Sequence, residues 1–286
     1  MTRTVYVNGR YLPEAEASLS IFDRAVLFAD AVYEVAAVID GALVDYAAHQ
    51  QRLERSLTQL GMHLPVAQDA LLEIHRQLLV KNELTEGLIY LQVSRGSADR
   101  NFLMPAKVTP SLVLFTQAIP LLDNVAATNG VRVISRPDMR WGRRDIKTTQ
   151  LLFASMMKTE AVAAGVDDVW LCEQGMVTEA SSSNAHIITD AGVLVTRPLS
   201  NEILHGITRA AVLDYAAESG MQVEQRAFSL EEAKRAREAF ITSATAFVTP
   251  VVEIDGVAIG TGHPGPATKR LRELYLLRSR STHGGF

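Results

Sequence analysis

The sequence predicts an α+β protein with two domains. A chain of 286 residues is long for a single hydrophobic core. Both halves combine short apolar runs of strand character with stretches in which apolar residues recur at helical spacing. A turn-prone segment rich in Asn and Asp, 118–130, lies between two strand-like runs. We therefore expect an N-terminal α/β domain over 1–120, a linker over 121–129 and a C-terminal α/β domain over 130–286.

Two hairpins are expected in the N-terminal half. The dipeptides Asn8-Gly9 and Asp40-Gly41 each lie between strand-like runs, a pattern that is typical of a tight turn between two strands. The other expected elements of this half are helices over 47–60 and 70–80 and strands over 88–93 and 112–115.

The C-terminal half is expected to begin with a strand over 131–134 and a helix over 148–164. A second helix over 206–219 is expected to end at Gly220, because glycine favours the left-handed backbone that closes helices. The remaining expected features are strands over 168–172 and 239–242, turns at Gln174-Gly175, 190–192 and Asp255-Gly256, and a frayed tail over 278–286.

The composition disfavours several classes of protein. Twenty-eight basic and 32 acidic residues give a formal charge of −4, without a basic run that could follow a nucleic-acid backbone. No apolar run approaches the roughly 20 residues needed to cross a bilayer, so membrane insertion is not expected. The one cysteine, Cys172, has no partner for an internal disulfide, and we expect a cytoplasmic protein. We assign no metal ligands.

Two segments suggest a pyridoxal phosphate site. Lys147 lies in the segment Asp145-Ile146-Lys147, and Glu179 is followed by the hydroxyl-rich run Ser181-Ser182-Ser183. Pyridoxal phosphate needs a lysine amine for a Schiff base, a carboxylate for its pyridine nitrogen and an anion-binding backbone for its phosphate. The sequence offers a candidate for each.

Seven short motifs follow one another along the chain. They are Asp23-Arg24, Phe28-Ala29-Asp30-Ala31-Val32-Tyr33-Glu34-Val35, His49-Gln50-Gln51-Arg52-Leu53, Asp145-Ile146-Lys147, Val177-Thr178-Glu179-Ala180-Ser181-Ser182-Ser183-Asn184, Gly206-Ile207-Thr208-Arg209 and Thr249-Pro250. In this order they resemble the class IV aminotransferases. These are fold-type IV pyridoxal phosphate enzymes, which include D-amino acid transaminases, branched-chain aminotransferases and aminodeoxychorismate lyases. The resemblance implies the two-domain fold of D-amino acid aminotransferases.

The resemblance also implies roles for the cofactor-binding residues. Lys147 matches the Schiff-base lysine, which also carries the substrate proton. Glu179 matches the partner of the pyridine nitrogen, where a carboxylate stabilises the positive charge. The residues expected at the phosphate or beside it are Arg52, Ser183, Ile207, Thr208 and Thr245.

The segment 95–105 resembles the loop that holds the substrate carboxylate in D-amino acid transaminases. Arg100 matches the arginine of that loop, whereas Phe102 replaces a histidine and cannot donate a hydrogen bond. Tyr33 matches a tyrosine near the substrate. Arg24 is a further candidate for the carboxylate, as are Arg143 and Arg144.

The leading expectation is a transaminase that moves the amino group of D-amino acids, such as D-alanine or D-glutamate, to 2-oxo acids by a ping-pong mechanism. Phe102 makes the pocket less polar, so (R)-amines are possible secondary substrates. The alternatives are a branched-chain L-amino acid aminotransferase, an aminodeoxychorismate-type lyase and a non-catalytic binding protein. The resemblance further implies a homodimer whose substrate loop is shared across the interface.

Overall fold

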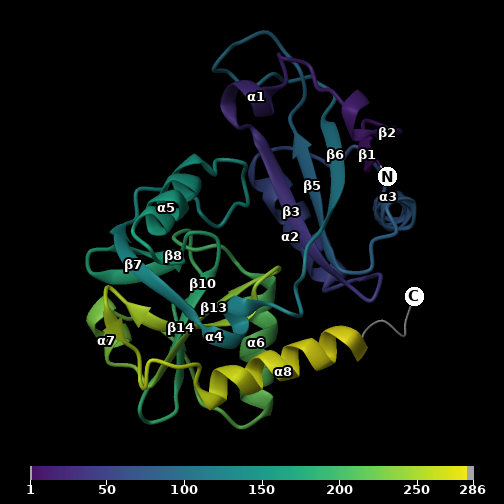
Figure 1. Ribbon diagram of the computed structural model, residues 1–286. Helices are drawn as coiled ribbons and strands as arrows, with labels where there is room; N and C mark the ends of the chain where they lie inside the picture. Colours follow the sequence, from purple (N-terminus) through teal and green to yellow (C-terminus); the bar gives the residue numbers. More distant parts are fainter. Residues whose placement is uncertain (1, 282–286) are drawn as a thin grey trace. The chain divides into compact units, whose positions relative to one another are not determined.

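The computed structural model describes residues 2–281, which fold into two compact units (Figure 1). The first unit contains residues 2–121 together with Ile146–Gln150, and the second contains Leu122–Asp145 and residues 151–281. Helices and strands occur in both, which confirms the predicted α+β class.

The first unit is built on a six-stranded sheet with the strand order β2-β1-β6-β5-β3-β4. All of its pairings are antiparallel. Its elements are β1 (Thr4–Val7), β2 (Arg10–Pro13), η1 (Glu14–Glu16), α1 (Arg24–Phe28), β3 (Ala31–Ile39), β4 (Ala42–Leu43), α2 (Tyr46–Gln59), α3 (Gln68–Lys81), β5 (Gly87–Ser94) and β6 (Ser111–Ala118).

Both predicted hairpins of this unit are confirmed. Val7 pairs with Arg10 around Asn8-Gly9, and Ile39 pairs with Ala42 around Asp40-Gly41. The turn residues have positive φ angles, a conformation that Asn, Asp and Gly adopt more readily than other residues.

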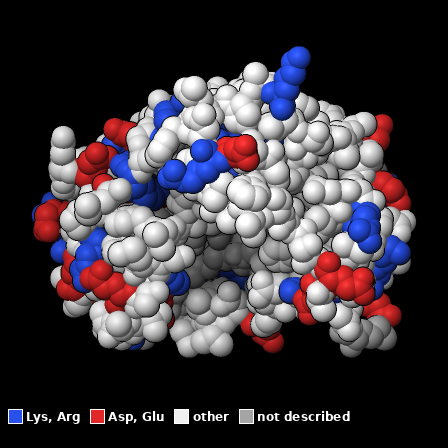
Figure 2. Space-filling model, turned by 90° about the horizontal axis from the view of Figure 1, so that it is seen from above, with Lys and Arg blue, Asp and Glu red and all other residues white. Residues whose placement is uncertain are grey.

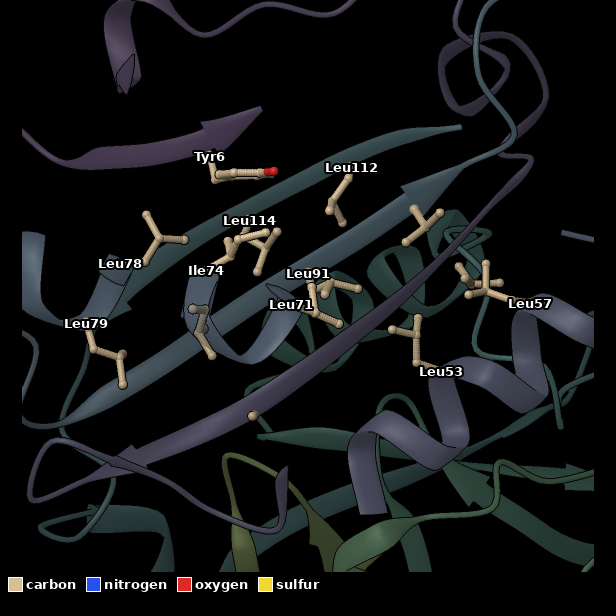
Figure 3. Packing of buried hydrophobic residues seen from close by; sticks show 14 of the residues in the cluster. Tyr6, Leu53, Leu57, Leu71, Ile74, Leu78, Leu79, Leu91, Leu112 and Leu114 are labelled. Atoms are coloured by element: carbon tan, nitrogen blue, oxygen red, sulfur yellow. The ribbon is translucent and has the colours of Figure 1, made fainter. Parts of the chain in front are cut away.

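The core of the first unit lies between the sheet and helices α2 and α3. Residues at alternate positions of β3, such as Val32 and Val38, belong to this core because successive side chains of a strand point to opposite faces. Figure 3 shows Leu53 of α2 and Leu71 of α3 directed toward strand residues that include Leu91. This packing holds β3 and α2 together, and both elements carry candidate site residues.

The segment Ile146–Gln150 packs on the first unit as an addition to β3. Strand β4 pairs only with the far end of β3, which leaves the edge near Ala31 open. There the Tyr33 amide donates to the Lys147 carbonyl at 2.9 Å, and the Thr149 amide donates to Ala31 at 3.1 Å. Ile146 is buried in the core of this unit. The sequence places Lys147 in the C-terminal domain, whereas these backbone bonds tie it to β3.

The second unit is built on a nine-stranded sheet in which eight strands follow the order β12-β11-β10-β13-β14-β7-β8-β9 and β15 pairs with β14. Strand β7 is parallel to both of its neighbours, β14 and β8. Its elements are α4 (Val125–Asn129), β7 (Val131–Pro137), α5 (Leu152–Ala163), β8 (Asp168–Glu173), β9 (Met176–Ala180), β10 (Asn184–Ile188), β11 (Leu194–Thr196), α6 (Ile207–Glu218), β12 (Val223–Gln225), α7 (Leu230–Lys234), β13 (Glu238–Ser243), β14 (Phe247–Ile254), β15 (Val257–Ala258) and α8 (Pro266–Ser281).

Two predictions for this half need correction. The helix expected from residue 148 begins at Leu152, because residues 147–149 pair with β3 instead. The tail expected to fray from residue 278 is helical up to residue 281, as part of α8. Helix α8 is held by the buried side chains of Leu271 and Tyr275, which recur at a spacing of four residues. Residues 282–286 lie outside the described part of the chain.

The surface charge and the composition of the helices can be compared with the expectation that the chain neither binds nucleic acid nor inserts into a membrane. On the face shown in Figure 2, basic and acidic side chains occur in small mixed groups separated by uncharged surface, and no extended basic stripe crosses it. Within residues 2–281, no helix is both long enough and apolar enough to span a bilayer.

Candidate active site

Lys147 lies above an aromatic ring of the first unit. Its Nζ is 4.3 Å from the centroid of the Tyr33 ring, within the range of a cation–π contact. The Tyr33 ring stacks on Tyr90 at 5.5 Å, and Tyr90 stacks on Phe115 at 4.8 Å. The row of rings crosses β3, β5 and β6, so the plane of Tyr33 is fixed by packing. The paired backbone of residue 147 and this ring together hold the lysine amine at a defined place.

Arg52 is buried beside an acid that the sequence analysis did not single out. Its Nε donates to Glu34 Oε1 at 2.8 Å and its Nη2 donates to Glu34 Oε2 at 2.7 Å. His49, one turn earlier on α2, contacts Glu34 Oε2 through Nδ1 at 2.8 Å. Burial opposes the ionised acid, but the charge and hydrogen bonds of Arg52 outweigh it and lower the pKa of Glu34 to about 2. Glu34 is therefore a carboxylate at neutral pH.

The loop between β5 and β6 presents Arg100 and Phe102 at the surface. The Arg100 guanidinium lies 5.4 Å from the Phe102 ring centroid, and Phe102 packs edge-on against Phe28 at 5.6 Å. The phenyl ring is 79% exposed in the single chain. The ends of the loop approach so closely that a Cβ on Gly96 would lie 2.0 Å from the Thr109 carbonyl oxygen, which explains the glycine.

The other candidate arginines have structural partners. Arg24 is buried, donates to Asp30 at 2.7 Å and donates to the Asn101 carbonyl at 2.8 Å, so it braces the loop between β5 and β6. Arg143 pairs with Asp145 at 2.9 Å. Arg144 lies 3.3 Å from Asp138 and 3.1 Å from Glu173.

Glu179 is a buried carboxylate of β9 in the second unit. Its Oε1 accepts from the Asn184 side chain at 2.7 Å and from the Leu204 amide at 2.8 Å, and its Oε2 accepts from Arg140 Nη1 at 2.7 Å. Burial raises the pKa of Glu179, while the charge and hydrogen bond of Arg140 and the Leu204 amide act in the opposite direction. The donors around this acid therefore offset only part of the cost of burying its charge.

Arg140 is a site residue that the sequence analysis missed. Its guanidinium bridges Glu179 and Asp138. Asp138 accepts from Arg140 Nη2 at 2.7 Å and from Arg140 Nε at 3.0 Å. Burial opposes the charge on Arg140, but its bonds to Asp138 and the charges of both acids raise the pKa of the guanidinium. The only signal in the sequence is a cluster of three arginines, Arg140, Arg143 and Arg144, just before Lys147.

The N-terminus of α6 provides oriented amides. Gly206 is its N-cap and has no side chain to accept from the first turn, so the amides of Ile207 and Thr208 have no intrahelical acceptor. A Cβ on Gly206 would lie 2.0 Å from Asn184 Oδ1, so the Asn184 side chain would have to move if residue 206 had a side chain. Such a helix terminus favours a bound anion through its amides and its dipole.

Two further candidates of the second unit lie at strand ends. Ser183 directly precedes β10 and its carbonyl accepts from the Ala180 amide at 2.8 Å. Thr245 lies in the tight turn between β13 and β14, where the Ser243 hydroxyl accepts from the Ala246 amide. Asp168, another buried acid of this unit, binds Ser181 at 2.6 Å and Lys158 at 3.0 Å.

Comparisons with known proteins identify the family. The model of the family described as amino-transferase class IV matches residues 31–254. The chain belongs to the class IV aminotransferases. This is a pyridoxal phosphate-dependent family, and the enzyme is a pyridoxal phosphate-dependent aminotransferase.

The aminotransferase is similar to curated proteins along almost its whole length. It is 38% identical over 268 residues to the D-alanine aminotransferase of Bacillus licheniformis, with 94% of each chain covered. It is 35% identical over 271 residues to the D-alanine aminotransferase of Staphylococcus aureus (strain N315), covering 94% of this chain and 95% of that one. Among solved structures, a branched-chain aminotransferase from the archaeon Thermoproteus uzoniensis with norvaline matches with a TM-score of 0.85 at 26% identity, covering 99% of this chain and 97% of that chain.

The residues of the two units fit the chemical needs of this cofactor. A helix N-terminus whose first amides have no intrahelical acceptor suits a phosphate, and a buried carboxylate held by three donors suits a protonated ring nitrogen. A lysine amine fixed against an aromatic face suits covalent attachment to an aldehyde.

Proposed function

We propose that this aminotransferase transfers the amino group of D-amino acids, such as D-alanine and D-glutamate, to 2-oxo acids by a ping-pong mechanism. The observation that carries this proposal is the similarity to D-alanine aminotransferases over nearly the full length of both chains. The second candidate is a branched-chain L-amino acid aminotransferase, which the likeness to the Thermoproteus uzoniensis structure supports at a lower identity of 26%.

Each cofactor-binding residue has a proposed task. Lys147 would attach to the cofactor. The proposed phosphate ligands are Arg52 in the first unit and the Ile207 and Thr208 amides in the second. Ser183 and Thr245 offer further hydroxyl donors at strand ends. Glu179 pairs with the ring nitrogen. When bound, pyridoxal phosphate withdraws electrons from the substrate's Cα, which makes the proton on that carbon acidic.

Lys147 is the proposed proton carrier. Its amine would take the proton from the substrate's Cα and give it back on the same side of the substrate. The contact with Tyr33 at 4.3 Å restricts where the amine moves, because the ring is itself held by two stacked neighbours. The lysine thus delivers its proton from one defined direction, which makes the reaction stereospecific.

Arg100 is the proposed anchor of the substrate carboxylate. It is exposed at the loop surface, whereas Arg24 is engaged with Asp30 and the Asn101 carbonyl. Phe102 beside it offers no hydrogen bond, so the carboxylate site has one donor residue fewer than the resembled loop. This lowers the penalty for substrates that lack a carboxylate and supports (R)-amines as secondary substrates.

We infer that the enzyme works as a homodimer in the cytoplasm. Its first unit exposes a group of large apolar side chains around α1 and the substrate loop, which are Ile21, Phe22, Val26, Phe102, Leu103 and Met104. Exposed apolar side chains grouped in this way are typical of a surface that another protein covers. Mass measurement in solution is expected to give twice the mass of one chain, and an equally active monomer at nanomolar concentration contradicts the shared-loop proposal. The single cysteine supports the cytoplasmic location.

Replacing Arg100 tests the substrate proposal. Arg100→Ala is expected to lower kcat/KM for D-alanine by an amount that corresponds to a loss of roughly 2–5 kcal/mol in transition-state stabilisation. The reason is that the substrate carboxylate loses its charged partner. The same variant should leave the kcat/KM for an (R)-arylamine nearly unchanged, since that substrate has no carboxylate. Phe102→His should improve kcat/KM for D-alanine by adding a donor. Equal losses for both substrates on Arg100→Ala would show that the arginine is structural.

A further inference from the structure

Glu34 is an acid at a position of the core where the strand pattern favours an apolar residue. Val32, Ala36 and Val38 occupy the same face of β3 and are buried in the hydrophobic core. The Glu34 side chain is 7% exposed, as is that of its partner Arg52. A buried ion pair adds little net stability compared with apolar residues of the same volume, because both charges lose their hydration. The fold alone therefore does not account for this pair.

The pairing fixes the Arg52 side chain in one orientation. Glu34 binds two nitrogens of the guanidinium at 2.8 and 2.7 Å, and such a two-point contact sets the plane of the group as well as its position. The contact joins two elements, because Glu34 belongs to β3 and Arg52 to α2 (Figure 1). His49 Nδ1 also contacts this carboxylate, at 2.8 Å from Glu34 Oε2. Arg52 is thus oriented before any ligand binds.

We infer that Glu34 is a positioning residue for the cofactor's phosphate and acts through Arg52. This inference rests on the proposed role of Arg52 as a phosphate ligand. An arginine that already has the required orientation loses less conformational entropy when it binds an anion. His49 supports Glu34 in the same way, by fixing the carboxylate that fixes the guanidinium.

If Glu34 acted only through its charge, it would weaken phosphate binding, whereas a positioning role strengthens it. Its negative charge neutralises Arg52, and removing that charge should strengthen the attraction between Arg52 and a phosphate. The sign of the change in affinity therefore separates positioning from electrostatics. Glu34→Asp separates them a second time, because it keeps the charge but withdraws the carboxylate by one methylene group.

The experiment compares the affinities of the apoenzyme for pyridoxal phosphate and for pyridoxal, which lacks the phosphate. Arg52→Gln is expected to weaken the binding of pyridoxal phosphate roughly 10- to 100-fold, while the affinity for pyridoxal changes little. Glu34→Gln and Glu34→Asp are each expected to weaken the binding of pyridoxal phosphate roughly 3- to 30-fold, again with little change in the affinity for pyridoxal. In the Arg52→Gln background, Glu34→Gln should have no further effect, as expected for residues that act as one unit.

Asp30→Asn is the matched control. It breaks another buried ionic cluster of the first unit, in which Arg95 donates to Asp30 at 2.7 and 3.0 Å and Arg24 donates to it at 2.7 Å. This variant should lose thermal stability but keep the ratio of the two affinities within about twofold. Thermal unfolding of every variant shows whether it is folded, and Glu34→Asp serves if Glu34→Gln does not fold.

The outcomes separate the two levels of the proposal. Unchanged or tighter pyridoxal phosphate binding in both Glu34 variants overturns the positioning role of Glu34. An equal loss of both ligands in those variants overturns it as well, because the effect is then not specific to the phosphate. A lack of effect of Arg52→Gln instead contradicts the role of Arg52 and moves the phosphate site elsewhere.

Discussion

Lys147→Ala is expected to lower transaminase turnover by at least about 10⁴-fold while the protein remains folded. The substitution removes the amine that attaches to the cofactor and also the proton carrier, so two functions are lost together. The fold should persist because residues 147–149 are held by backbone bonds to β3 and by the buried side chain of Ile146, which the substitution leaves in place.

Two readouts check this expectation. Turnover of D-alanine with 2-oxoglutarate reports the chemistry, and the visible absorbance of the lysine-bound cofactor reports the attachment, which should disappear. Lys269→Ala, which replaces an exposed lysine of α8, is the control and should change neither readout. Near-normal turnover with unchanged absorbance in Lys147→Ala would show that another lysine attaches the cofactor.

Glu179→Gln is expected to retain the cofactor but to lower kcat by roughly 10²- to 10³-fold. A glutamine has nearly the same shape as the glutamate and can still accept through its carbonyl oxygen, but it carries no charge to stabilise a protonated ring nitrogen. It also leaves the partly buried guanidinium of Arg140 without the carboxylate that it now contacts at 2.7 Å. The loss should therefore appear in kcat and in the pH dependence of the cofactor's spectrum.

Glu253→Gln provides the matched control for this variant. Glu253 is a strand glutamate of the same unit, on β14, and its replacement should leave both kcat and the spectrum unchanged. If Glu179→Gln keeps the normal rate and spectrum, the partner of the ring nitrogen lies elsewhere. Asp168 is a poor substitute, because Ser181 and Lys158 already bind it.

Local signals in the sequence predict much of the fold. The turns at Asn8-Gly9, Asp40-Gly41 and Asp255-Gly256 form because these residues tolerate positive φ angles, and all three appear as predicted. The start of α5 was not predictable in this way. Residues 148–151 have a helical pattern, but the edge of β3, more than 100 residues earlier in the chain, offers residues 147–149 strand-like bonds.

Some residues of the candidate site could be predicted from local sequence motifs, and others could not. Lys147 and Glu179 lie in recognisable motifs, so the sequence identifies them as candidates. Glu34 and Arg140 are visible only in the structure, because each acts on a partner that is distant in the sequence, 18 residues away for Glu34 and Arg52 and 39 for Arg140 and Glu179. Their importance comes from burial and charge pairing, which no local pattern reports.

The most direct test of the central claim is the rate at which single substrates convert the cofactor to its pyridoxamine form. D-alanine, L-leucine and an (R)-arylamine are mixed separately with the holoenzyme, and 2-oxoglutarate is then added to confirm that the amino group is passed on. We predict that D-alanine converts the cofactor fastest, that the (R)-arylamine follows and that L-leucine is slowest. Faster conversion by L-leucine than by D-alanine would contradict the proposal and assign the enzyme to branched-chain L-amino acids.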